Sequence, residues 1–121
     1  MLVGKRVLVV EPEFLVALDL QRLLESAGAT ETAFARSVGE ARQLDGHFAR
    51  YDLVLVDVPG EGVEATGLIR QLREEGIAVV AMTTGTLHRP AFGVPLLGKP
   101  FTDDTLLAAC DRAMAGRPLA P

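Results

Sequence analysis

Short apolar runs alternate with amphipathic stretches along the chain, and this alternation constrains the fold more than any other feature. The runs are RVLVV (6–10), ETAFA (31–35), YDLVLVDV (51–58), IAVVAM (77–82) and VPLLG (94–98). Three of them are almost entirely apolar, which is typical of strands that are covered on both faces. We therefore expect five strands with helices between them.

The segments between the runs carry helical periodicity. Apolar residues spaced at i, i+3, i+4 and i+7 form stripes, and these stripes are Leu20/Leu23/Leu24/Ala27, Ala41/Leu44/Phe48, Ala65/Leu68/Ile69/Leu72 and Leu106/Ala109/Cys110/Ala113. Ser37 and Glu40 predict a capping box before the second stripe, and Thr102 predicts an N-cap before the last. The segment 83–93, TTGTLHRPAFG, has no stripe, so we expect a short or missing fourth helix there. Right-handed crossovers then give a parallel sheet with helices on both faces, a doubly wound three-layer α/β/α fold.

Length and charge limit the classes of protein that fit. The chain has 121 residues, which suits one domain spanning 1–121, with residues 115–121, AGRPLAP, expected as a flexible tail. A net charge of −4 without a basic cluster argues against binding to nucleic acid. No apolar run approaches the roughly 20 residues that cross a bilayer. With a single cysteine, these features predict a cytoplasmic protein.

Polar residues gather where the predicted strands end. Glu11 and Glu13 follow the first strand, Asp57 ends the third, Thr83 ends the fourth and Lys99 ends the fifth. Ligands of open parallel sheets bind at this edge. Carboxylates there can hold Mg²⁺, and Asp57 can attack a phosphoryl group as a nucleophile. The ammonium group of Lys99 and the hydroxyl of Thr83 can bind the phosphoryl oxygens.

Four motifs resemble the receiver domain of two-component response regulators across essentially the whole chain. They are VLVVE, YDLVLVDV with Asp57, VVAMT with Thr83, and LLGKPF with Lys99 and Pro100. The resemblance implies a flavodoxin-like fold and a phosphorelay role, in which Asp57 accepts phosphate from a histidine kinase. It also implies that Thr83 and Lys99 bind the product and that the peptide before Pro100 is cis.

The metal site departs from the family pattern. Receiver domains usually have two adjacent acids after the first strand, and here these positions are Glu11 and Pro12. The remaining candidate ligands are Glu11, Asp57 and the backbone carbonyl of Pro59, with Glu13 as a further candidate. Loss of one charge about 4 Å away, at an effective dielectric constant of ~20, costs up to about 4 kcal/mol. We therefore expect Mg²⁺ binding to be weakened or lost.

Several alternatives stay open. Glu11, Pro12 and Glu13 can simply begin a helix, with the proline at its first position, and Lys99 can be a structural counter-ion of Asp57. The partners implied are a sensor histidine kinase or phosphotransfer protein and a downstream protein, and a homodimer is left open. A degenerate receiver that works as a phosphorylation-independent interaction module is the alternative function. It is favoured by Pro12 and by Leu96, where the family has an aromatic residue.

Overall fold

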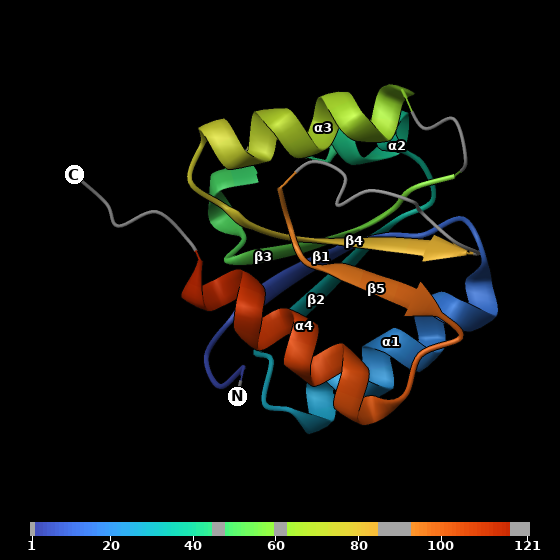
Figure 1. The fold of residues 1–121 in the computed structure, drawn as a ribbon, viewed down its shortest axis with the longest axis vertical. Coiled ribbons are helices and arrows are strands. Elements are labelled where there is room, and N and C mark those ends of the chain that lie inside the picture. The colour runs from blue at the N-terminus through green and yellow to red at the C-terminus, as the bar shows by residue number, and fades with distance from the viewer. Residues whose placement is uncertain (1, 45–47, 60–62, 85–92, 117–121) are drawn as a thin grey trace.

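The computed structural model describes residues 2–44, 48–59, 63–84 and 93–116. Within these ranges the strands are β1 (Arg6–Val10), β2 (Glu31–Ala35), β3 (Leu53–Asp57), β4 (Ala78–Thr84) and β5 (Leu96–Lys99). The helices are α1 (Phe14–Ser26), α2 (Val38–Gln43), α3 (Val63–Glu74) and α4 (Asp103–Ala115), with a 3-10 turn, η1 (Phe48–Arg50). Figure 1 shows three layers, with α2 and α3 on one face of the sheet and α1 and α4 on the other.

The five strands form one parallel sheet in the order β2-β1-β3-β4-β5. Each neighbouring pair is parallel, so every strand ends at the same edge. The register places Val10 beside Val56 and Asp57 beside Met82. This arrangement confirms the predicted flavodoxin-like, doubly wound α/β/α fold.

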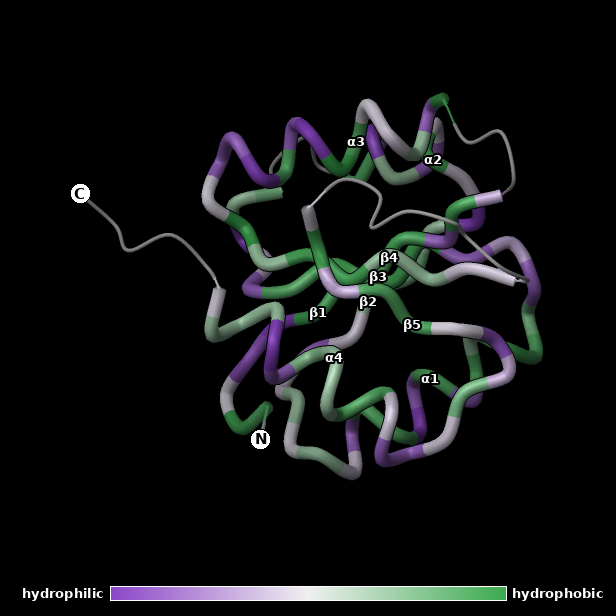
Figure 2. Tube along the Cα trace, viewed as in Figure 1, coloured by the Kyte–Doolittle hydropathy of each residue, from purple (hydrophilic) through white to green (hydrophobic). Residues whose placement is uncertain are grey.

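The sheet separates two apolar cores. One core joins alternate residues of the central strands, such as Val9 and Leu55, to the buried stripes of α1 and α4. The other joins the intervening residues, such as Val10 and Val56, to α2 and α3. Figure 2 shows the hydrophobic colour concentrated along the strands, while hydrophobic and hydrophilic segments alternate along the helices. The valine-rich runs are therefore buried on both faces, as the sequence predicts.

Helix α2 is shorter than its apolar stripe predicts. The side chain of Ser37 accepts a hydrogen bond from the Glu40 backbone N–H, as expected of an N-cap. The carboxylate of Glu40, however, accepts from the Arg36 N–H at 3.2 Å, one residue before the position a capping box requires. The helix ends at Gln43, and Phe48 is buried from η1 rather than from α2. The stripe correctly identified Ala41 and Phe48 as buried, whereas Leu44 is only partly buried, and the stripe did not predict the end of the helix.

Helix α1 begins later than a proline at its first position would require. Its first residue is Phe14, and Glu13 is the N-cap in an extended conformation. Pro12 therefore lies outside the helix, and the interpretation of Pro12 as the first helical residue is wrong. Helix α4 has the predicted N-cap, because Thr102 and Thr105 form a reciprocal capping box.

Some sequence predictions fall wholly or partly outside the described residues. In the segment 83–93, residues 83–84 belong to β4 and residue 93 is in a turn, while residues 85–92 lie outside the described ranges. The predicted short or missing helix is therefore untested. Ala115, the first residue of the expected tail, belongs to α4. Residues 117–121 of that tail lie outside the described ranges. Among the described residues, no helix is long and apolar enough to span a membrane.

Candidate functional site

Three of the predicted site residues come together at the edge where the strands end. Glu11 follows β1, Asp57 is the last residue of β3, and Lys99 is the last residue of β5. Alternation along the strands explains why they meet. Val9, Leu55 and Leu97, two residues earlier in each case, all belong to the core beneath α1 and α4. The three polar side chains therefore start from the same face of the sheet.

The ammonium group of Lys99 lies between the two carboxylates. Its Nζ is 2.6 Å from Asp57 Oδ1 and donates a hydrogen bond to it. The same Nζ is 2.5 Å from Glu11 Oε1, as an ion pair rather than an aligned hydrogen bond. The single positive charge of Lys99 is therefore shared between the carboxylates of Glu11 and Asp57. The predicted proximity of Lys99 and Asp57 is present in the structure.

The two carboxylates differ in access to solvent. The Glu11 side chain is fully buried, and its Oε2 accepts a hydrogen bond from the Glu13 backbone N–H at 3.0 Å. The side chain of Asp57 keeps 16% of its surface exposed. Glu11 is therefore built into the loop between β1 and α1, whereas Asp57 is the carboxylate that a small reactant can reach.

The environment of Lys99 favours the charged ammonium form. Burial lowers the pKa of Lys99, but the hydrogen bond to Asp57, the close contact with Glu11 and the negative charges of both acids outweigh burial, so the pKa is raised overall. Opposite charges within a few ångströms favour the ionised form in this way. Lys99 is consequently a permanent cation at neutral pH.

Thr83 reaches the same edge from the other face of the sheet. It lies one residue beyond Met82, which is beside Asp57 in the sheet register. By strand alternation its side chain continues the row of Val79 and Ala81, which pack toward α2 and α3. Thr83 is 5% exposed. Its position is compatible with the predicted role near Asp57, but it is not part of the ion-pair cluster with Lys99 and Glu11.

The residues present are a poor fit for Mg²⁺. The described residues contain no group of three or more Asp, Glu, His or Cys side chains that could hold a metal ion. Pro12 offers no side-chain oxygen, and Glu13 is exposed and contributes its backbone N–H to Glu11. Glu11 and Asp57 already share the Lys99 ammonium group. A small ion that requires octahedral oxygen ligands lacks a ligand set here.

A pocket of about 310 Å³ opens beside Asp57 on the side of α2 and α3. Its walls include Asp57 and Pro59 after β3, Pro12 after β1, Arg36 after β2 and Glu64 in the first turn of α3. Pro59 therefore lies beside Asp57 as predicted, although a metal role for its carbonyl stays a prediction. Arg36 is a residue that sequence reasoning missed, because the end of the second strand offers no motif. The shared strand edge was the only signal that could have found it.

Comparison with known structures identifies the architecture. The signal receiver domain of a signal transduction histidine kinase from Syntrophus aciditrophicus matches with a TM-score of 0.77 and 24% identity, covering 98% of this chain and 96% of that chain. A response regulator receiver domain protein from Clostridium thermocellum matches with a TM-score of 0.74 and 22% identity, covering 92% and 94%. This chain has the receiver fold. The structural neighbours are response regulator receiver domains.

A third neighbour is larger than this chain. The anti-anti-sigma factor PhyR from Bartonella quintana matches with a TM-score of 0.73 and 27% identity. The alignment covers 93% of this chain and 48% of that chain, so the receiver fold here spans about half the length of PhyR. No protein-family model matches the sequence, and there is no significant match among curated proteins.

Proposed function

We propose that this receiver domain accepts a phosphoryl group on Asp57 from a phosphohistidine of a histidine kinase or phosphotransfer protein, and signals by binding another protein. The observation that carries the proposal is the contact between Lys99 Nζ and Asp57 Oδ1 at 2.6 Å, at the edge of the sheet beside an open pocket. A partly buried cation that contacts one oxygen of a reachable carboxylate is suited to binding the product of phosphorylation.

The bonds formed and broken in the transfer balance between the two partners. A carboxylate oxygen of Asp57 attacks phosphorus, the bond from phosphorus to the imidazole nitrogen breaks, and the imidazole leaves with its electron pair. After the transfer, the ammonium group of Lys99 can contact a phosphoryl oxygen in place of Asp57 Oδ1. The hydroxyl of Thr83, at the end of β4, is the proposed second donor to that product.

Exposed apolar side chains next to the site support a protein partner. Phe14 and Leu15, in the first turn of α1, are 72% and 77% exposed, and Leu18, one turn later, is 44% exposed. A groove of about 510 Å³ runs from Leu15 and Leu18 to Lys99 and Phe101. Exposed apolar patches of this kind mark interaction surfaces. We propose that the phosphoryl donor docks here, close to Asp57.

A phosphorylation-independent interaction module is the second candidate function. This second candidate is supported by the ion pair between Lys99 and the fully buried Glu11. The ion pair holds the lysine in place without a phosphoryl group. In this case the surface of α1 would bind its partner whatever the state of Asp57.

The two candidates differ in a covalent product. Incubation with acetyl phosphate and Mg²⁺ is expected to add one phosphoryl group to the intact mass, and Asp57→Asn is expected to abolish the gain. Asp104→Asn is a matched control, since Asp104 is an exposed acid in the first turn of α4 that lines neither the groove nor the pocket beside Asp57. An unmodified wild-type protein in these conditions would refute the phosphoacceptor role and leave the interaction module.

A further inference from the structure

The cluster at the end of the sheet has a charge balance that opposes an incoming phosphoryl group. Glu11 and Asp57 contribute two negative charges and Lys99 contributes one positive charge. A phosphoryl group brings further negative charge to this site. A divalent cation would reverse the balance, but the ligand set described above does not fit one. Another positive group has to face Asp57 if the pocket binds oxyanions.

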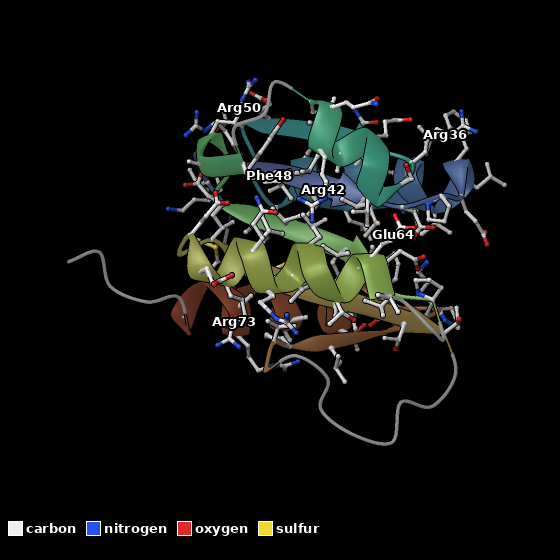
Figure 3. All side chains as sticks on the ribbon, turned by 90° about the horizontal axis from the view of Figure 1, so that it is seen from above. Arg36, Arg42, Phe48, Arg50, Glu64 and Arg73 are labelled. Carbon is white, nitrogen blue, oxygen red and sulfur yellow. The ribbon has the colours of Figure 1, made fainter. Side chains whose placement is uncertain are left out.

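Arg36 is the one positively charged residue that lines the pocket beside Asp57 in the described part of the chain. It lines the same pocket as Asp57, together with Pro12 and Pro59. Its backbone N–H donates to Glu40 Oε1 at 3.2 Å, which fixes its place between β2 and α2. Its side chain is exposed, and no ion pair or hydrogen bond ties its guanidinium group to another described residue. Figure 3 shows Arg36 at the end of the molecule where the strands finish, on the same side as the start of α3.

We infer that Arg36 is the cationic group with which the Asp57 pocket binds a phosphate-like oxyanion, in the place of a divalent metal ion. The inference rests on the proposed function and adds to it the group that recognises the phosphoryl oxygens. A guanidinium group offers several N–H donors in one plane and pairs with two oxygens of a phosphate at once. Pro12, which lines the pocket with Arg36, has no side-chain oxygen that could compete for the guanidinium group.

Glu64 limits the affinity of the pocket. It is the remaining charged residue in the described wall, and it lies exposed in the first turn of α3. Its negative charge repels an anion bound in the pocket. Neutralising Glu64 should therefore act in the opposite direction to neutralising Arg36, and this pair of opposite effects is specific to an electrostatic site.

The test measures binding of inorganic phosphate in buffer with EDTA, by amide chemical shifts of Ser37 and Asp57. Arg36→Gln is expected to weaken phosphate binding by about tenfold, the effect of a lost charge-assisted hydrogen bond. Glu64→Gln should strengthen it. The matched control is Arg70→Gln, because Arg70 is an exposed arginine of α3 that does not line the pocket, and it should leave binding unchanged. Urea midpoints will verify that each variant is folded.

The inference is overturned if wild-type protein binds phosphate only with Mg²⁺, if it does not bind phosphate at all, or if Arg36→Gln binds as wild type does. Labelling by acetyl phosphate separates this result from failure of the proposed function. Phosphate binding that depends on Arg36, without any labelling of Asp57, would refute the phosphoacceptor role and support the anion site. Labelling of Asp57 that needs Mg²⁺ and is equal in wild type and Arg36→Gln would support the phosphoacceptor role and refute the anion site.

Discussion

Replacing Lys99 by methionine isolates the energetic role of the buried ammonium group. In the wild-type protein Nζ is 2.5 Å from Glu11 Oε1 and 2.6 Å from Asp57 Oδ1, so the two carboxylate oxygens are at most about 5 Å apart. Two unit charges at about 5 Å repel by about 3 kcal/mol at an effective dielectric constant of ~20. Removing one partner of a buried ion pair typically costs about 3–5 kcal/mol. We therefore expect Lys99→Met to lower the free energy of unfolding by at least about 3 kcal/mol at pH 7.

Urea denaturation followed by far-UV circular dichroism measures this change, since the chain contains no tryptophan. Glu11→Gln in the Lys99→Met background should recover at least half of the loss, because only Asp57 stays charged. Lys5→Met, at the other lysine of the chain, is the control and should change stability by less than about 1 kcal/mol. Equal stabilities of the two lysine variants would show that the reasoning is wrong.

Three further predictions concern stability. Burial raises the pKa of Cys110 to about 12, whereas the thiol of the unfolded chain ionises near pH 9. The contribution of the buried thiol to the free energy of unfolding is therefore complete below pH 9 and is lost as the pH rises to about 12. The difference in stability between wild type and Cys110→Ala, measured in urea, should narrow over that range. Thr102→Ala removes the N-cap of α4 and should cost about 1 kcal/mol in urea denaturation, whereas Thr30→Ala, at an exposed threonine outside the helices, should cost less. Gly28→Ala should lower the melting temperature, because Gly28 has a φ of +103° and an added Cβ would lie 2.8 Å from a neighbouring side chain. Gly67→Ala should raise the melting temperature, because Gly67 lies within α3 and an added Cβ would face open space. The reverse order of the two melting temperatures would contradict the backbone argument.

Sequence reasoning recovered the parts of the molecule that depend on local pattern. A valine-rich run such as residues 6–10 can be buried on both faces only inside a sheet, and its bounds agree with β1. The cis peptide between Lys99 and Pro100 is also present, as the resemblance implied. The roles of Asp57, Thr83 and Lys99 in phosphorylation are still predictions.

Features that depend on particular side-chain contacts, on loop conformation or on the order of the strands could not be predicted. The start of α1 is set by Glu11, whose buried carboxylate binds the Glu13 N–H, and no local preference of proline reveals that contact. The end of α2 is set by Leu44, which adopts an extended conformation and separates the helix from Phe48. Arg36 matters only because β2 lies next to β1, which brings it to the pocket beside Asp57.

The division of the interior by the sheet also bears on how the protein can change. Leu24, beneath the sheet, and Ile69, above it, are both fully enclosed, yet they belong to different clusters. Effects of substitutions at sites without shared neighbours are nearly additive. The side that carries α1 and α4 can therefore drift in sequence without compensating replacements under α2 and α3, and each half can be redesigned independently of the other.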